Sequence, residues 1–380
     1  ARLEHIPDLR DAQIAGPLAV TARVGGSFAE PVAEASLQIA QLAYRGASLG
    51  GMRLDAGLAD GRLDARLGLP GGGTTTLALG LAAPRPLAAD LEVTDLLLDP
   101  IFEALADALP PSAAGATGRL SVAGHLDGNL DDRRSLEGEV RLAALSLAGG
   151  GARLALRAPS TVELTAGGAR LRQLAFDVGD GGIVLDGEAS PSEVALALSL
   201  DLDPAVVNGL VKGVEVRPGR VRTPDGPLVL RRDAAGRLAA DGRVRVATES
   251  LSVRAYPYPI ERIDLAFDFA GERVTVANAG SPIRVGDGEV RIDVAADLGE
   301  QRLERAIVSF VELPYRSPGT FRVLASGRVE ASGSARDLAV KGRVRIDDAL
   351  YERDVEVLQG LIRPLAGKTQ TRGSSEPPPA

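Results

Sequence analysis

The chain has 380 residues, of which 45% are apolar and 25% are charged, a composition typical of a folded protein with one large unit or a few domains. The formal charge of −8 removes the positive surface that binding to a phosphate backbone requires, so nucleic acid is not an expected partner. The absence of cysteine excludes disulfides and thiolate chemistry.

The chain begins directly in patterned sequence. Residues 1–7 lack the basic-then-apolar order of a signal peptide, and no stretch of about 18 or more residues is apolar and uncharged. The sequence therefore predicts neither a signal peptide nor a membrane-spanning helix. We expect the chain to be a segment of a longer protein.

Alternation of apolar with small or polar residues runs along most of the chain. This spacing places every second side chain on one face of a β-strand. In chain order, the clearest apolar series are Val194, Leu196, Leu198, Leu200 and Leu202; Ile263, Leu265, Phe267 and Phe269; Val290, Ile292 and Val294; and Val344 and Ile346.

Glycine-containing turns separate the predicted strands. Residues 71–73, 179–181 and 286–288 combine glycine with residues that tolerate positive φ, so they favour tight antiparallel hairpins. A short phrase of glycine, polar, β-branched or leucine, polar and apolar residues begins at Gly118, Gly138, Gly242, Gly288 and Gly342. Its irregular intervals argue against a propeller or a solenoid of fixed repeat length.

Two short helices are predicted between the strands. Asp99 and Asp203 are the expected N-caps of helices over residues 99–109 and 203–212, each with proline in the first helical position. A weaker helical pattern covers residues 354–365. Residues 367–380 have the proline-rich composition of a linker, and we expect a disordered tail there.

The number of strands bears on how the apolar face is covered. Alternation usually means a dry core between two packed sheets, in a sandwich or a closed barrel. This chain carries about twenty strands, however, and open sheets rarely exceed about ten without curling or splitting. No linker divides the alternating region, so we expect a mostly β, elongated and curled antiparallel sheet over residues 1–366. The apolar series would line its groove, and an array of separate sandwiches is the alternative.

No catalytic motif is complete. His5 and His125 are far apart, and His125, directly after Gly124, is predicted to be a solvated residue at the end of a strand. Residues 367–369 imitate the end of a phosphate-binding loop, but the required preceding glycine is Ile362. No Gly-x-Ser-x-Gly elbow occurs. We therefore predict a protein that is not an enzyme and that has no metal or cofactor.

Several phrases resemble the TamB and AsmA-like envelope proteins of Gram-negative bacteria. Residues 116–131 followed by 136–142, and residues 285–292, are similar to their recurring glycine-and-alternation phrase. Residues 338–353 resemble the TamB element in which a tyrosine, here Tyr351, precedes charged residues. The resemblance covers most of residues 90–365.

The resemblance implies a taco-like β-groove in the periplasm. It implies a non-enzymatic role in which the groove shields phospholipid acyl chains during transport between the inner and outer membranes. The implied partners are phospholipid, a TamA-type outer-membrane barrel and the inner membrane, through an N-terminal anchor that this chain lacks. The alternative function is a scaffold that assists outer-membrane barrel assembly by strand augmentation.

Overall fold

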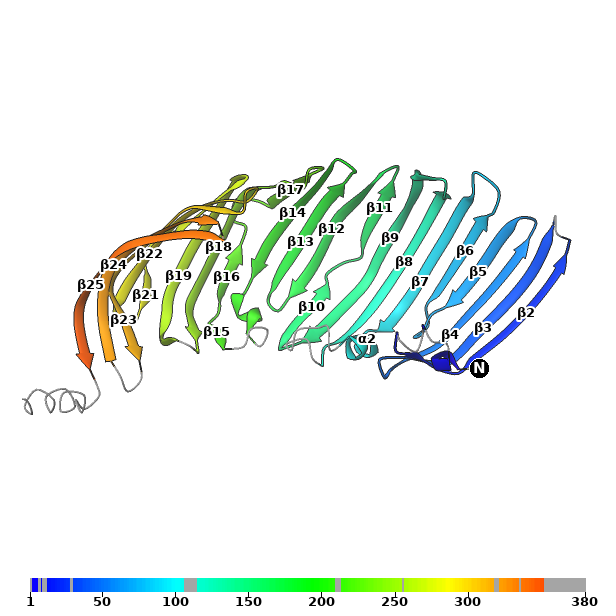
Figure 1. Ribbon diagram of the computed structural model, residues 1–380, viewed down its shortest axis with the longest axis horizontal. Coiled ribbons are helices and arrows are strands. Elements are labelled where there is room, and N and C mark those ends of the chain that lie inside the picture. The colour runs from blue at the N-terminus through cyan, green and yellow to red at the C-terminus, as the bar shows by residue number, and fades with distance from the viewer. Residues whose placement is uncertain are drawn as a thin grey trace, which may run out of the picture.

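The computed structural model describes residues 2–5, 8, 12–27, 30–105, 115–208, 213–254, 256–317, 321–334 and 336–351. These residues are mostly β, as predicted, and all the strands belong to one sheet (Figure 1). Three short helices lie within these ranges: η1 (Leu3–His5), α2 (Asp99–Ala104) and η3 (Pro204–Val207). No helix among the described residues is long and apolar enough to cross a membrane.

The sheet contains 25 strands. In the first half of the chain they are β1 (Ile14–Ala15), β2 (Leu18–Gly26), β3 (Pro31–Tyr44), β4 (Ala47–Ala59), β5 (Arg62–Gly68), β6 (Thr74–Gly80), β7 (Pro86–Leu97), β8 (Thr117–Asn129), β9 (Asp132–Gly149), β10 (Ala152–Leu156), β11 (Ser160–Thr165), β12 (Gly168–Val178) and β13 (Gly181–Ala189). The second half contributes β14 (Glu193–Leu202), β15 (Val214–Val216), β16 (Gly219–Arg222), β17 (Leu228–Asp233), β18 (Leu238–Val253), β19 (Tyr256–Gly271), β20 (Arg273–Asn278), β21 (Ile283–Val285), β22 (Gly288–Asp297), β23 (Arg302–Ser317), β24 (Phe321–Ser334) and β25 (Asp337–Tyr351).

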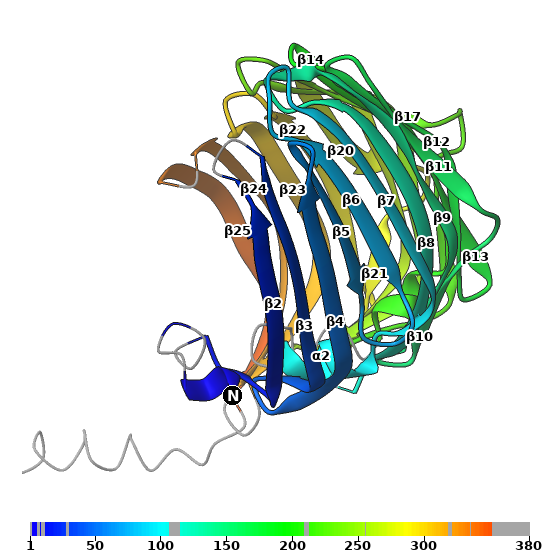
Figure 2. The ribbon, with the colours of Figure 1, turned by 90° about the vertical axis from the view of Figure 1, so that its right-hand side faces the viewer.

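The strands form an antiparallel meander in which neighbours in sequence are neighbours in space. Some positions hold an interrupted strand: β10 and β11 both pair with β9, and β15, β16 and β17 all pair with β18. We call the edge where β3, β7, β23 and β25 end the lower rim, because it lies at the bottom of Figure 1, and the opposite edge the upper rim. Viewed along its long axis, the sheet curves into a trough (Figure 2).

The glycine turns lie where the sequence predicts them. Residues 69–73 connect β5 to β6, and residues 179–180 and 286–287 connect the flanking strands at the lower rim. Gly179 and Gly286 adopt φ of 57° and 59°, the left-handed conformation that glycine enters without steric cost. These tight turns keep successive strands adjacent and antiparallel.

The predicted helices are only partly as expected. Asp203 caps η3 by accepting a hydrogen bond from Ala205 N at 2.9 Å, as predicted. The predicted cap of α2 is wrong: the N-cap is Leu98, while the Asp99 carboxylate accepts a hydrogen bond from Gly118 N at 2.8 Å, at the start of β8. The ends of both predicted helices, the helix over 354–365 and the tail over 367–380 lie outside the described residues.

Three bulges bend long strands. At each one a polar residue with positive φ interrupts the register, and its backbone N–H donates to a side chain of the next strand. The pairs are Asp95 with Ser121 at 2.9 Å, Gln173 with Asp186 at 2.8 Å and Glu312 with Ser326 at 2.9 Å. Because a bulge increases local bend and twist, these sites help to curl the sheet.

The repeated phrase marks places where two backbones approach each other closely. A Cβ added to Gly118, Gly138, Gly242, Gly288 or Gly342 would lie 3.2 Å or less from a backbone carbonyl oxygen of the adjoining segment. At Gly138, within β9, that oxygen belongs to His125 and would be only 2.1 Å away. Glycine at these positions therefore permits the tight curl of the sheet.

Replacing Gly138 by alanine tests this role. We expect Gly138→Ala to lower the free energy of unfolding by about 1–3 kcal/mol, since the strands must separate to admit the methyl group. Urea denaturation followed by circular dichroism measures this change. Gly57→Ala in β4 is the matched control, because nothing lies within 4 Å of its Cβ position. Equal stability of the two variants would contradict the proposed close approach.

Candidate functional site

Strand register places the predicted groove residues on one face of the sheet. Residues directly opposite each other in an antiparallel pair share a face. Leu198 is opposite Leu185 on β13 and Leu228 on β17, and Phe267 is opposite Val244 on β18 and Val276 on β20. Following such pairs from β14 to β25 connects every apolar series predicted from the sequence.

We call this face the apolar wall. Its predicted members are Val194, Leu196, Leu198, Leu200, Leu202, Ile263, Leu265, Phe267, Phe269, Val290, Ile292, Val294, Val344 and Ile346. The wall continues without a break into the first half of the chain, where Leu37, Leu54 and Leu67 follow one another across β3, β4 and β5. Sequence reasoning missed that half. Met52, Leu54 and Leu58 show the same alternation, but alanine and glycine between them weaken the signal.

The wall is neither fully buried nor fully exposed. Most of its predicted residues are half-buried against their neighbours within the sheet, including Leu198 and Phe267. Val194, Val344 and Ile346 are 47%, 58% and 64% exposed. The last two lie on β25, which pairs with β24 on only one side.

No second layer built from the described part of the chain covers the wall over most of its length. Among the described residues no large side chain is fully buried, as a dry sandwich core would require. Ile39 and Val93 on the wall are 4% and 6% exposed, and Ala104 of α2 is 4% exposed. The helix contacts β4 and β8 near the lower rim and lies on the hollow side of the curved sheet (Figure 2). The wall therefore lines the hollow, and α2 closes only its lower end.

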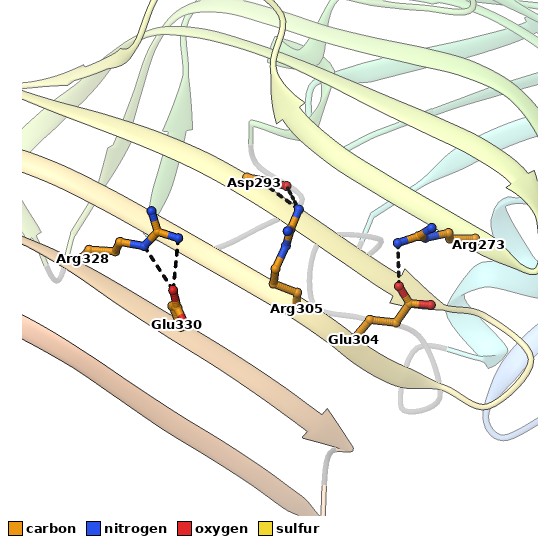
Figure 3. A network of polar contacts seen from close by, with 6 residues as sticks. All are labelled: Arg273, Asp293, Glu304, Arg305, Arg328 and Glu330. Carbon is orange, nitrogen blue, oxygen red and sulfur yellow. Dashed lines mark hydrogen bonds and ion pairs between the residues drawn. The ribbon is translucent and has the colours of Figure 1, made fainter.

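The opposite face carries rows of ion pairs. Arg220 binds Asp201 through two contacts of 2.6 and 2.8 Å, and Arg245 binds Asp264 at 2.8 and 2.6 Å. The guanidinium partners hold the pKa of both aspartates below the ordinary value. Figure 3 shows the row continuing over β20 to β24 through Arg273–Glu304, Arg305–Asp293 and Arg328–Glu330.

These ion pairs contribute little individually to stability. Their side chains are mostly about half exposed, and a surface ion pair contributes roughly 0–1 kcal/mol. They keep one face of the sheet hydrated, so only the wall remains to contact apolar matter. A hollow of about 910 Å³ on this polar face is lined by charged side chains such as Arg62 and Asp64, which pair with each other.

His125 is placed differently from the prediction. It lies within β8 rather than at its end, because the strand continues through Gly124 to Asn129. On the polar face, its Nδ1 is 2.6 Å from an Asp90 oxygen and its Nε2 is 2.5 Å from an Asp127 oxygen. Asp90 first, and then Asp127, raise the pKa of His125 above its ordinary value. Both nitrogens are occupied by carboxylates, so this arrangement stabilises the imidazolium form.

The described part of the chain contains no group of three or more histidine, aspartate or glutamate side chains placed to bind a metal ion. His5 belongs to η1, far along the chain from His125. Residues 71–73 form a hairpin turn rather than the start of a helix, and residues 367–369 lie outside the described residues. The apolar wall is thus the outstanding surface of the molecule.

Comparisons with known proteins supply no relative: no family model, curated protein or solved structure matches the chain.

The Asp90–His125–Asp127 contact makes stability depend on pH. Because the folded-state pKa of His125 is raised, its stabilising effect is present below the unfolded pKa of 6.5 and is lost as pH rises through the raised value. We expect His125→Gln to destabilise the protein at pH 5.5 and to have little effect at pH 9. Urea unfolding of both proteins at each pH measures this difference.

The matched control is Asp127→Asn, which removes one carboxylate and keeps the imidazole. We expect it to lower the pKa of His125 in an NMR titration. A His125 pKa that does not change in this variant would show that the Asp127 contact does not form in solution.

Proposed function

We propose that the apolar wall shields phospholipid acyl chains, so that lipid moves along the trough between two membranes without entering water. The observation that carries this proposal is a continuous apolar face, from β2 to β25, that the described residues leave uncovered except at its lower end, where α2 lies. Soluble proteins rarely expose contiguous apolar patches larger than a few hundred Å², and larger ones mark surfaces that contact apolar partners.

The size of the wall fits an extended hydrophobic ligand. About twenty strand positions spaced ~4.8 Å apart give a trough on the order of 100 Å long. Its side chains are mainly aliphatic, and the polar residues on the same face are scattered: Arg232, Thr248 and Asn278 lie opposite Val194, Ile263 and Leu265. Such a surface can contact an acyl chain at many positions and binds it tightly at no single position.

Energetics favour movement rather than capture. Each buried methylene gains about 0.8 kcal/mol relative to water, so two acyl chains with even partial contact gain more than 10 kcal/mol. A bilayer offers the same gain. Transfer between bilayer and wall therefore costs little net free energy, while escape into water is strongly opposed.

The resemblance to TamB and AsmA-like proteins supports a location in the periplasm of a Gram-negative envelope. In this proposal the wall is one section of a longer bridge, anchored in the inner membrane and directed towards a TamA-type barrel in the outer membrane. The chain acts as a passive conduit and catalyses no reaction.

A charge placed on the wall tests the proposal. We expect Leu198→Arg to reduce lipid that copurifies with the protein several-fold, because an unpaired charge next to acyl chains is costly. Native mass spectrometry after mild extraction measures occupancy, and circular dichroism confirms folding. The matched control is Ala197→Arg, one residue away on the polar face and opposite Asp186.

Two outcomes would contradict the proposal. One is a native protein that carries no lipid after mild extraction and binds none from vesicles. The other is full lipid occupancy of a folded Leu198→Arg variant, which would remove β14 from the lipid-contacting surface.

A second candidate function rests on β25. All of its residues are exposed, and its large apolar side chains Leu338, Val340, Val344, Ile346 and Leu350 are more than half exposed. On its outer side β25 pairs with no strand that the structure describes, and a long edge of this kind is a template for another strand. We propose as the alternative function that β25 receives a strand of an outer-membrane barrel protein during assembly.

Photocrosslinking separates the two candidates. A photoreactive residue replacing Val344 should capture an unfolded barrel protein if β25 receives its strands, whereas one replacing Leu198 should capture lipid. Val344→Lys should reduce the capture of protein, because charged residues protect an edge against strand addition. Capture of protein at Leu198 and not at Val344 would remove the case for β25.

A further inference from the structure

One charged residue, Arg232, lies among the aliphatic residues of the apolar wall. It is the next-to-last residue of β17, and the register places it opposite Val194 on β14 and Leu238 on β18. In strands β13 to β18, no other described residue at a wall position is charged. Because a charge beside acyl chains is costly, Arg232 is an exception to the chemistry of the wall.

The side chain of Arg232 extends to the upper rim. There β17 ends at Asp233, β18 begins at Leu238, and residues 234–237 connect the two strands (Figure 1). A Cβ added to Gly236 would lie 3.4 Å from Nη2 of Arg232, so the guanidinium lies beside this turn rather than over the middle of the trough. An arginine at such an edge covers apolar surface with its aliphatic stem while its charge stays in water.

The guanidinium of Arg232 has no counterion within the described part of the chain, whereas the arginines nearest to it in sequence are paired. Arg231 lies on the outer face and binds Asp241 at 2.6 Å, and Arg237 binds Asp233 at 2.7 Å. The Arg232 side chain is exposed and makes no hydrogen bond or ion pair with a described residue. Its five N–H donors therefore remain available to a ligand.

Exposed aliphatic side chains flank this arginine on both sides. Val194 and Leu238 are 47% and 41% exposed, although both belong to strands inside the sheet. Below them, Leu196 on β14 and Leu230 on β17 lie opposite each other and continue the wall towards the lower rim. A positive charge with free donors thus lies directly above an uncovered aliphatic surface. This combination matches a molecule with an anionic head and a hydrocarbon chain.

We infer that Arg232 binds the phosphate group of a phospholipid whose acyl chains lie against the wall below it. This inference rests on the proposed function and adds a position for the headgroup, at the upper rim between β14 and β18. A guanidinium binds phosphate through charge-assisted hydrogen bonds, often two in parallel. The aliphatic part of the wall binds an acyl chain tightly at no single position, so Arg232 adds one position at which the polar end of a lipid is bound.

Lipid binding from solution tests this inference. Fluorescent phosphatidic acid and the matching diacylglycerol differ only in the phosphate, and a soluble cyclodextrin carrier delivers both without a membrane surface. We expect the native protein to bind phosphatidic acid more tightly than diacylglycerol. Arg232→Gln should bind phosphatidic acid about tenfold more weakly and diacylglycerol with unchanged affinity. Circular dichroism confirms that the variant is folded.

The matched control is Arg231→Gln. It removes the same charge one residue earlier in β17, but on the outer face, where Arg231 pairs with Asp241. We expect this variant to bind phosphatidic acid as the native protein does. A large excess of inorganic phosphate should not displace the lipid, because most of the binding free energy comes from the acyl chains.

The position of the headgroup is measured separately, since the chain has no cysteine. A fluorophore is attached to a single cysteine, either Ala235→Cys in the upper-rim turn or Ser252→Cys near the lower end of β18. The protein is then loaded with phosphatidylcholine that carries a nitroxide on its headgroup. We expect strong quenching of the fluorophore at position 235 and weak quenching at position 252.

The outcomes separate this inference from the proposed function. Equal affinity for phosphatidic acid and diacylglycerol, or unchanged affinity in Arg232→Gln, overturns the headgroup position while leaving the acyl-chain wall intact. An equal loss of affinity in Arg231→Gln shows an effect of net charge and also overturns it. Displacement by inorganic phosphate identifies a site for a free anion instead, and equal or stronger quenching at position 252 removes the headgroup from the upper rim. If the native protein binds neither lipid, the proposed function fails as well.

Discussion

The structure depends on the register of one antiparallel meander. A slip of one residue between two strands would turn every later apolar side chain to the opposite face. Over the whole sheet this does not happen: wall residues remain opposite wall residues from Val20 and Leu37 on β2 and β3 to Gly327 and Val344 on β24 and β25. Short turns fix the register locally, and the bulges preserve it. Leu171 and Leu174, for example, flank a bulge, and both remain opposite wall positions of β13. Because apolar side chains stay on the same face in every strand, the sheet has one continuous apolar face.

Curvature then gives the face its shape. A flat sheet of the same register would expose two open surfaces and would stack readily with other sheets. The bulges at Asp95, Gln173 and Glu312 and the close approach at Gly138 curl the sheet, so that the apolar side becomes the inside of a trough. Paired charges such as Arg245 and Asp264 hydrate the outside. Sequence alternation therefore specifies the chemistry of the two sides, while glycines and bulges determine which side is concave.

Much of the fold is readable from the sequence because its causes are local. Alternation over Val194–Leu202 specifies a strand and its faces without knowledge of its neighbours, and the glycine turns specify antiparallel connections. The predictions that were wrong concern features with non-local causes. Asp99 has the right sequence context for a helix cap, but Gly118, nineteen residues later, occupies its carboxylate. His125 follows a glycine that resembles a strand end, yet Gly124 lies within β8, paired with Leu91 and Val140 on the strands beside it. The part of the wall before residue 90 was not predicted, because alanine and glycine between the apolar residues weaken the alternating pattern.

The meander also determines how the length of such a sheet can change in evolution. Most contacts of each strand are with the strands beside it, so the sheet is nearly one-dimensional, and its parts have few long-range dependencies. Removing or inserting a hairpin of two strands preserves strand direction, register and the side on which apolar residues lie. Length is consequently a quantity that gene duplication or deletion can adjust in steps of roughly 10 Å, two strand spacings at a time. A sandwich of the same size has no such freedom, because every strand there also packs against an opposing sheet.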